Sequence, residues 1–521
     1  MKADATAVNW PRIVLICIGL MVSTAFLLAI FWNNPYPSVP ADPDSVYIFS
    51  SLSKLTGNTV RHNAHPGLTL QIAGALPIVL GAIFCREEGL IQKVIANMPF
   101  FQQLFVGLVA SSLIVALVVF LWTSYQKDRP IHTVIIALIG IAALTPPSLG
   151  KVMGVNSDFY AFSLSILYVT SLLWKRNWKN DVLTSLFFVL MAYTKITFAP
   201  LCLLMFTMDK KCLHRLLKGT FVWSLLIFLV FWELDQFYGF RSFMLHSSML
   251  NKPGSLTLST VLKFHTKFFL ENKVQSIYIL LFLLFGILLI LKNKFRTTGI
   301  LGLIIIITIV ETTLLRQGKA VIYTWSAFPV GMLLTLTLLR AYPRVAALIV
   351  PVFIILFIAS TMIIHEDVTD ARKRGMQRLK YQQEYKRILT EASARCLLEY
   401  HGRQPYHHLS IGSSYWLANA FSRREYAPYL KKYFNDRFGL RDLFYMQQHK
   451  DGRPAIRRYF EKGESESLQW IPSEGGCLSI ESNLESEFKT MFPQVELVPV
   501  CSLKNSGIKI LKIQKANEPF L

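Results

Sequence analysis

Long apolar runs separated by short polar clusters fill the first 365 residues of the chain. The first run, 13–32, has about the 20 residues that a helix needs to cross a bilayer. Comparable runs lie at 100–124, 131–147, 158–174, 182–194, 196–208, 219–234, 275–291, 298–313, 324–339 and 344–364. The short pair 182–194 and 196–208 fits either two half-length helices or one bent element. The pattern predicts a polytopic α-helical membrane protein with about eleven transmembrane helices.

The polar clusters predict how these helices are oriented, because cytoplasmic loops carry an excess of lysine and arginine. With a cytoplasmic N-terminus, every inner loop is basic: 126–129, 175–179, 209–218, 292–296 and 340–344. The outer connections are then 33–99, 148–157, a turn near Lys195, 235–274 and 314–323. This alternation requires that the apolar stretch 67–84 does not cross the membrane. We therefore expect a juxtamembrane helix there, lying in the outer leaflet.

The pattern changes after residue 365, where a polar segment of single-domain size begins. It opens with an amphipathic helical pattern at 367–400. Strand-like runs follow at 408–411, 477–480, 495–500 and 508–513, with helical stretches at 414–424 and 483–491. The sequence thus predicts a transmembrane domain (1–365) and a C-terminal soluble α/β domain (366–521) on the extracytoplasmic side. In an oxidising compartment, Cys477 and Cys501 would be able to pair.

Composition excludes several classes of protein. Hydrophobic residues make up 53% of the chain and charged residues only 17%, whereas soluble domains are about one quarter charged. The net charge of +22 comes from 54 basic and 32 acidic residues. Because this charge lies in clusters between apolar runs, it does not indicate nucleic-acid binding. No glycine-rich phosphate loop, cofactor motif or cysteine–histidine metal spacing is present. The chain also lacks glycosylation sequons, which favours a bacterial inner membrane.

The first outer loop carries the most informative chemistry. Asp42 and Asp44 lie just beyond the first apolar run, and Arg61, His62 and His65 follow before the juxtamembrane stretch. A carboxylate facing cationic groups at a membrane surface suits a reaction on a lipid-linked phosphate. The carboxylate would take a proton from an acceptor hydroxyl, and the cations would neutralise the departing phosphate. The competing interpretation is that Asp44 only caps a helix.

Several motifs together resemble the GT-C superfamily of membrane glycosyltransferases. The resemblance covers roughly residues 12–364 and is strongest to the bacterial branch that is like protein O-mannosyltransferases and lipid A aminoarabinose transferases. The motifs are the acidic stretch 42–47, the proline turn 65–67, the second-loop Asn156-Ser157-Asp158, the turn 193–197, and Arg316-Gln317-Gly318-Lys319 with Tyr323 and Pro329. One departure concerns the acidic motif, which in the family is an adjacent Asp-Glu pair four residues before a tyrosine. Here the two aspartates are separated by Pro43 and precede Tyr47 by five and three residues.

The resemblance implies transfer of a sugar from a polyprenyl-phosphate donor to a lipid, glycan or protein acceptor, outside the cytoplasm and with inversion. Asp44 is the favoured general base, although the motif leaves Asp42 open, and Asp158 would assist. The expected phosphate- and substrate-binding residues are Arg61, His65, Lys195, His246, Arg316, Lys319 and Tyr323. No divalent metal is indicated, since the second outer loop lacks a paired Asp-x-Asp.

Two other function classes compete with a transferase. A transporter or flippase of a lipid-linked glycan would show polar or broken spans at the midplane and repeat symmetry. A scaffold with a partner-binding C-terminal domain would leave the outer acidic and cationic residues unused. Single residues also remain open: Lys195 fits an interfacial anchor, His246 and His265 fit ordinary loop histidines, and Glu311 fits either a functional role or an ion pair with Arg316.

Overall fold

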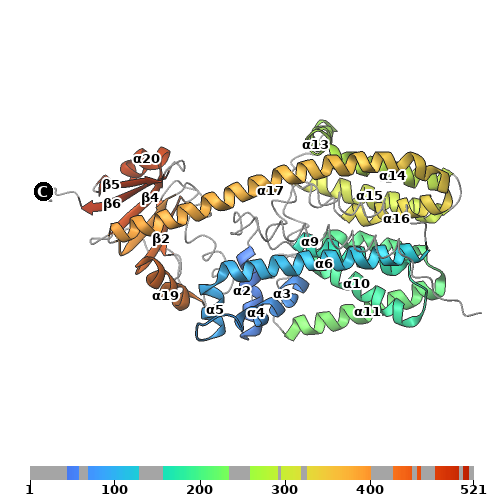
Figure 1. The fold of residues 1–521 in the computed structure, drawn as a ribbon, viewed down its shortest axis with the longest axis horizontal. Helices are drawn as coiled ribbons and strands as arrows, with labels where there is room; N and C mark the ends of the chain where they lie inside the picture. Colours follow the sequence, from blue (N-terminus) through green and yellow to red (C-terminus); the bar gives the residue numbers. More distant parts are fainter. Residues whose placement is uncertain are drawn as a thin grey trace, which may run out of the picture. The chain divides into compact units, whose positions relative to one another are not determined.

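The computed structural model describes a large part of the chain, and all structural statements below concern that part. The described residues are 44–57, 68–127, 157–233, 258–291, 295–317, 326–392, 394–400, 426–448, 454–458, 476–493, 495–503 and 508–515. Contacts divide the chain into two units (Figure 1). Unit 1 comprises Met1–Asn33, Asn63–Leu70 and Val106–Ala371, and unit 2 comprises Asn34–His62, Gln71–Phe105 and Arg372–Leu521. Each unit is described separately.

The described part of unit 1 is helical. It holds most of α6 (Met98–Lys127), α9 (Ser157–Leu172), α10 (Trp178–Thr194), the 3₁₀ helix η1 (Ile196–Thr207), α11 (Lys210–Glu233), α13 (Leu258–Glu271), α14 (Lys273–Leu291), α15 (Arg296–Gln317), α16 (Ala327–Ala341), η3 (Pro343–Val345) and the first part of α17 (Ala346–Glu391). Apart from α13, which was not predicted, these helices follow the predicted apolar runs. The runs 13–32 and 131–147 lie outside the described residues.

Membrane-spanning character is evident in three of the described helices, which are long and apolar enough to cross a bilayer. Their spans are Phe100–Thr123, Lys210–Leu229 and Lys273–Leu291. Shorter apolar helices include Phe159–Leu172 and Ala327–Ala341. The protein is therefore a multi-pass membrane protein, while the total of eleven helices stays a prediction.

Small residues bring the helices of unit 1 close together. A Cβ on Gly299 of α15 would lie 2.8 Å from the carbonyl oxygen of Gly286 on α14, so these backbones touch. A Cβ on Gly331 of α16 would overlap the ring of Phe282 on α14. Since lipid tails are as apolar as the helices, close packing of this kind holds membrane helices together.

The helices α9 and α10 form an antiparallel pair with a tight connection, and several contacts place the basic loops at one end of it. Trp174 in the connection donates from Nε1 to Thr123 Oγ1 near the end of α6 at 3.0 Å. Cys212 at the start of α11 contacts Asp181 at the start of α10. The expected inner loops around 175–179 and 209–218 therefore share one end. Which side of the membrane that end faces stays a prediction.

The second half of the short apolar pair is not an α-helix. Lys195 directly joins α10 to η1, a 3₁₀ helix of 12 residues that contains Pro200. A 3₁₀ helix rises about 2.0 Å per residue, against about 1.5 Å in an α-helix. The 12 residues of η1 are therefore about as long as the 17 of α10. The greater rise per residue explains how the short apolar run of η1 can be about as long as the α-helix beside it.

Unit 2 contains the helices of the first outer loop. These are α2 (Asp44–Leu55), the second half of α3 (Leu68–Ala73), α4 (Ala75–Ala82), α5 (Leu90–Ala96) and the start of α6. The predicted juxtamembrane helix is thus two helices, broken at Gly74, where a Cβ would overlap Phe105 and Ser51. Pro77 and Ile78 of α4 are buried, whereas Leu76 and Leu80 are exposed. This distribution fits a helix that lies on a membrane.

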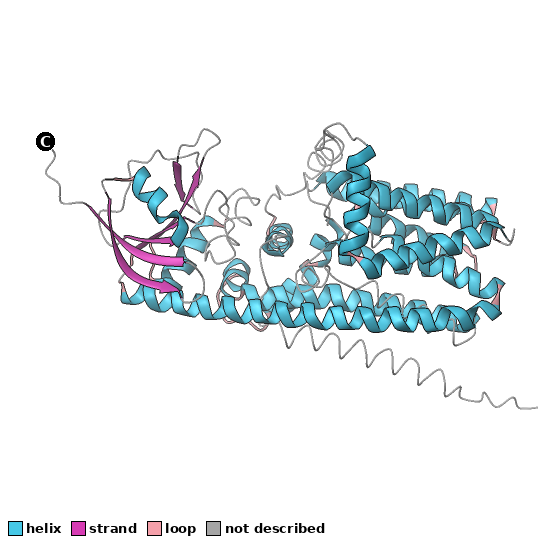
Figure 2. Ribbon diagram, turned by 90° about the horizontal axis from the view of Figure 1, so that it is seen from above, coloured by secondary structure: helices cyan, strands magenta, loops and turns pink. Residues whose placement is uncertain are grey.

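The C-terminal part of unit 2 is a six-stranded mixed sheet with helices on both faces (Figure 2). The strands are β1 (Cys396–Tyr400), β2 (Asp442–Gln448), β3 (Pro454–Arg458), β4 (Gly476–Glu481), β5 (Val495–Leu503) and β6 (Ile508–Lys515), in the order β3-β2-β1-β4-β6-β5. Helix α20 (Glu485–Met491) covers one face through Phe488, which packs on Tyr400. The end of α17 covers the other face, where Tyr385 bonds to Ser479.

The elements predicted for the C-terminal segment need correction. The predicted helix 367–400 is part of α17, which ends at Glu391, and 396–400 is instead strand β1. Strands β2 and β3 and helix α19 (Ala427–Phe438) were not predicted; the expected elements 408–411 and 414–424 lie outside the described residues. Residue 365 lies within α17, and the domain boundary expected after it stays a prediction.

The suggested pairing of Cys477 with Cys501 does not fit the sheet. Cys477 is a free thiol on β4, and β6 lies between β4 and β5. Two strand spacings amount to about 9.6 Å, beyond the roughly 7 Å limit between Cα atoms for a disulfide. Burial raises the pKa of the Cys477 thiol to about 11, so it is also a poor nucleophile.

Candidate functional site

The described residues include only part of the predicted site. Asp44 is the first residue of α2, Asp158 is the second residue of α9, and Arg316 lies in the last turn of α15. Their side chains are outside the described part. The predicted site residues Asp42, Arg61, His65, His246, Lys319 and Tyr323 lie outside the described residues altogether. Lys195 is the predicted site residue whose side chain is described.

Lys195 occupies a buried position between α10 and η1. Its residue surface is only 4% exposed. Its backbone is extended, its N–H donates to Met191 O at 2.9 Å, and its carbonyl oxygen accepts from Phe198 N at 3.1 Å. Because α9 and α10 run antiparallel, Lys195 lies at the same end of the pair as the start of α9, where Asp158 is. A buried cation and an acidic helix start therefore share one end of unit 1.

A threonine pair connects this end to the first outer loop. Thr69, in the first turn of α3, hydrogen-bonds to Thr194, the residue before Lys195. The Thr69 hydroxyl also lies 3.4 Å from Leu190 O, and Thr194 Oγ1 donates to the same oxygen at 2.7 Å. The segment that follows the proline turn 65–67 is thus held beside Lys195. Thr69 and Thr194, which are 125 residues apart in the sequence, thus meet in the structure.

Glu311 pairs with a histidine of α13, whereas the side chain of Arg316 lies outside the described part. His265 Nε2 on α13 lies 3.0 Å from Glu311 Oε1 on α15. The sequence suggested Arg316 as the partner of Glu311, and α13 was not predicted. Periodicity would have shown this helix, since Leu258–Glu271 has apolar residues at helical spacing. The pair links α13 to the end of α15 that carries Arg316.

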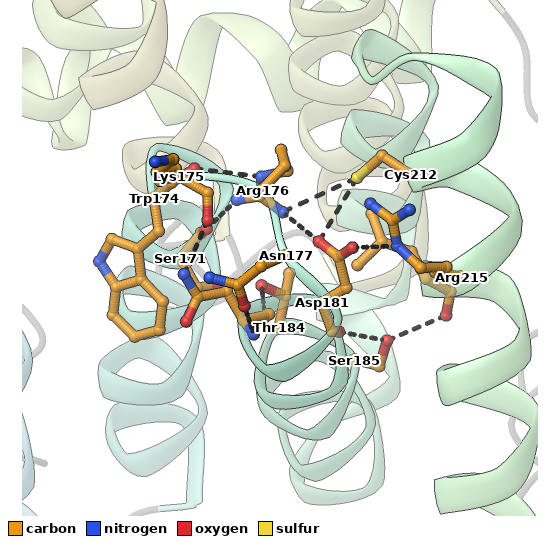
Figure 3. Close-up of polar contacts among 12 residues, drawn as sticks. Ser171, Trp174, Lys175, Arg176, Asn177, Asp181, Thr184, Ser185, Cys212 and Arg215 are labelled. Carbon is orange, nitrogen blue, oxygen red and sulfur yellow. Dashed lines mark hydrogen bonds and ion pairs between the residues drawn. The ribbon is translucent and has the colours of Figure 1, made fainter.

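The opposite end of α10 contains a carboxylate that sequence reasoning missed (Figure 3). Asp181 is completely buried. Its Oδ1 accepts from Arg176 Nη1 at 3.2 Å, and its Oδ2 accepts from Arg215 Nε at 2.5 Å. Cys212 Sγ is 3.5 Å from Oδ1. An acidic residue five positions after an arginine in a basic loop was the available signal. Asp181 is neutralised by the protein itself, which indicates a structural role.

Helix α2, which begins at Asp44, is anchored within unit 2. Ser53 Oγ lies 2.8 Å from Tyr426 OH, and the ring of Phe49 packs 4.9 Å from the Tyr426 ring. Ser51 Oγ donates to Gln71 O on α3 at 2.7 Å. Burial also lowers the pKa of Lys54, in the last turn of α2, to about 7. Asp44 of the acidic motif is thus the first residue of a helix that is held from two directions.

A metal site does not emerge from the side chains that the structure describes. Within them, no three histidine, cysteine, aspartate or glutamate residues lie close enough to hold a metal ion. The aspartates of the outer loops are not among these side chains. We therefore derive no step that involves a metal.

Comparisons with known proteins give a fold. No protein-family model and no curated protein matches the sequence. Among solved structures, ArnT from Cupriavidus metallidurans bound to undecaprenyl phosphate aligns over 98% of this chain and 99% of its own, with 12% identity and a TM-score of 0.54. The apo oligosaccharyltransferase of Archaeoglobus fulgidus aligns over 85% and 70%, with 12% identity and a TM-score of 0.51. The chain has the GT-C glycosyltransferase fold.

This result confirms the fold that the sequence motifs predicted through their resemblance to the GT-C superfamily. The match to ArnT spans nearly the whole of both chains, so it includes the C-terminal residues as well as the apolar helices. At 12% identity the likeness concerns architecture.

Proposed function

We propose that the protein is a glycosyltransferase that moves a sugar from a polyprenyl-phosphate donor to a lipid, glycan or protein acceptor on the extracytoplasmic side of a bacterial inner membrane. The supporting observation is the end-to-end likeness in fold to ArnT, a structure with undecaprenyl phosphate bound. The meeting of the segment after the proline turn with Lys195 adds support from this chain itself.

In this proposal the acceptor oxygen attacks the anomeric carbon while the bond from that carbon to the phosphate oxygen breaks. Attack from the face opposite the phosphate inverts the anomeric configuration and releases polyprenyl phosphate. Asp44 takes the proton of the acceptor hydroxyl, and Asp42 and Asp158 assist. Asp44 suits this role because it begins α2, a helix anchored through Ser53 and Tyr426. A rigid support keeps a general base within reach of its proton.

The departing phosphate needs positive charge near it. Lys195 is buried, so its attraction to a phosphate would be screened less than that of a surface lysine. Arg316, at the end of α15, and Lys319 would complete the phosphate site, with Arg61 and Tyr323 beside it. His65 and His246 would shape the sugar-binding part. The juxtamembrane helices α3 and α4 would border the groove that admits the lipid.

The experiment that tests this proposal identifies the donor by mass. Purified protein is incubated with a polar lipid extract from a bacterial membrane, and polyprenyl-phosphate sugars are followed by mass spectrometry. Loss of one such species, with matching release of polyprenyl phosphate and a sugar-sized gain on an acceptor, is the expected outcome. Movement of an intact glycolipid across vesicle membranes without bond cleavage would favour a flippase. If neither sugar transfer nor glycolipid movement is observed, the scaffold interpretation is favoured.

The proposed orientation has a separate test. A cysteine introduced at Lys432, an exposed position of α19, should react with a membrane-impermeant maleimide from the periplasmic side of intact spheroplasts. A cysteine at Lys179, in the expected inner loop, should react only after the membrane is opened. The reverse pattern would overturn the extracytoplasmic placement of the C-terminal domain and with it that of the proposed site.

A further inference from the structure

The end of α10 and α11 that lies away from Lys195 carries a basic group of side chains, which the proposed reaction does not use. We call it the inner cluster; it consists of Lys175, Arg176, Lys179, Lys210, Lys211, Arg215 and Lys218. The two acidic residues among them are already engaged. Asp181 binds two arginines, and Asp209 accepts from the backbone N–H of Cys212 at 2.8 Å, capping α11. The cluster therefore keeps a strong positive charge.

Arg215 is the best-organised member of the inner cluster. Asp181 Oδ2 accepts from its Nε, and within the described part of the chain its two Nη groups donate no hydrogen bond. Its side chain is 41% exposed. The free Nη pair is the planar fork that binds a phosphate through two parallel hydrogen bonds. Lys211 and Lys218 lie on the same face of α11, at i−4 and i+3 from Arg215, and both are exposed.

The surface next to this fork is apolar. Between Lys218 and Glu233 the sequence of α11 contains no charged residue, and only 11% of its membrane span is buried in the protein. Phe221, Val222 and Leu225 are among its exposed side chains. Trp178 is also exposed, with Lys179 over its ring at 5.8 Å. Tryptophan at the end of a span is typical of the interface between headgroups and acyl chains.

We propose that the inner cluster binds an anionic phospholipid of the cytoplasmic leaflet. The Nη fork of Arg215 holds the phosphate oxygens, Lys211 and Lys218 add charge, and the acyl chains lie along the exposed face of α11. The buried Asp181 keeps the guanidinium in place. The positive-inside rule puts this end of the helices in the cytoplasmic leaflet, and anionic lipids there attract basic residues. The site is distinct from the polyprenyl-phosphate site proposed at the other end of α10.

The test measures lipid binding to the full-length protein. Delipidated protein in a neutral detergent is titrated with phosphatidylglycerol or phosphatidylcholine, and bound lipid is counted by native mass spectrometry. The wild type should prefer phosphatidylglycerol. Arg215→Gln should weaken that binding about tenfold, the effect of losing a charge-assisted contact. Because Arg215 also contacts Asp181, the double variant Lys211→Gln/Lys218→Gln provides a second probe that leaves this ion pair intact. Lys432→Gln, at an exposed position of α19 in unit 2, is the matched control.

Three outcomes would overturn the proposal. Equal binding of both phospholipids by the wild type would show that no anionic site exists. Unchanged phosphatidylglycerol binding in both the Arg215 variant and the double lysine variant would place the lipid elsewhere. A further titration with undecaprenyl phosphate distinguishes the lipid substrate from a structural lipid: if it binds at this cluster and phosphatidylglycerol does not, the assignment to a phospholipid is wrong. A tenfold loss confined to phosphatidylglycerol and to these variants supports it.

Discussion

Helix α10 has a buried ionisable residue at each end, and the two illustrate different uses of charge in a membrane protein. Asp181, near its start, lies between Arg176 and Arg215. Lys195, directly after its end, lies beside the threonine pair that joins it to the first outer loop. At Asp181 the compensating charges belong to the protein, so the residue is explained by folding. For Lys195 we propose a contact with the phosphate of the substrate.

Burial alone does not identify a functional charge. Both residues are almost completely inaccessible, and an ionisable group within a membrane is a functional hypothesis by default. What separates them is the surrounding sequence. Basic residues surround Asp181, whereas Lys195 shares its end of the helix pair with Asp158 and with the start of α3. Substitutions at the two ends should therefore change different measurable quantities.

The largest effect is expected at Asp44, the proposed general base. Asp44→Asn should lower the rate of sugar transfer by about 10²–10⁴-fold, because the amide cannot accept the proton of the acceptor hydroxyl. Folding and donor binding should be retained, since asparagine and aspartate are similarly good at a helix start. The rate is measured with purified protein under single-turnover conditions.

Asp42→Asn is the control for Asp44. If Asp42→Asn abolishes transfer and Asp44→Asn does not, the acidic motif is correct and Asp42 is the base. If both variants remain active, the general-base mechanism in this loop is wrong. A large loss of thermal stability in Asp44→Ala, with full activity in Asp44→Asn, would instead show a capping role.

The next effect is expected in stability, at Asp181. Asp181→Ala leaves Arg176 and Arg215 without their shared carboxylate, and breaking a buried ion pair typically costs about 3–5 kcal/mol. The apparent melting temperature in detergent should fall markedly, and the donor KM of the remaining folded protein should stay near the wild-type value. Ser185→Ala is a matched control on the same helix, because it removes a hydroxyl that bonds to the backbone oxygens of Asp181 and Leu216, at 2.9 and 3.0 Å, but leaves the carboxylate and both arginines in place. An unchanged melting temperature in Asp181→Ala would contradict a structural role.

A smaller effect, in donor use, is expected at Lys195. Lys195→Met keeps the length of the side chain and removes the charge, so the transition state loses a bond to the phosphate worth about 1.5–3 kcal/mol. The ratio kcat/KM for the donor should fall about 10- to 100-fold, with little change in melting temperature. Thr194→Val tests packing at the adjacent position, since it removes the hydroxyl contact with Thr69 but keeps the cation. Equal losses in both variants would argue that Lys195 acts as an anchor.

The sequence predicted one end of α10 better than the other. The apolar runs predict α9, α10 and α14 to within a few residues, because the bilayer imposes length and hydrophobicity directly on a spanning helix. Lys195 was found because it interrupts an apolar run. Asp181 was missed because its partners come from the preceding loop and from α11, and a pattern read along one helix does not show which loops meet.

The C-terminal segment shows where local patterns are least informative. Strand β1 was read as the end of a helix, since five residues after a long amphipathic helix carry little signal of their own. Its pairing partners β2 and β4 start at residues 442 and 476. Such distant pairings decide the structure of a parallel sheet. The contact of Ser53 with Tyr426, 373 residues apart, was equally invisible to local reasoning.

The smallest expected effect concerns this distant contact. Tyr426→Phe removes the hydroxyl bonded to Ser53 but keeps the ring that packs on Phe49. A hydrogen bond of this kind contributes about 0.5–1.5 kcal/mol. If α2 positions Asp44, kcat should fall by a small factor, up to about tenfold, while the KM for the donor stays constant. Tyr433→Phe, which loses an exposed hydroxyl bonded to Arg437 on α19, is the matched control and should leave both constants unchanged. Equal kcat in the wild type and Tyr426→Phe, together with a lower melting temperature, would show that the contact stabilises unit 2 without positioning the base.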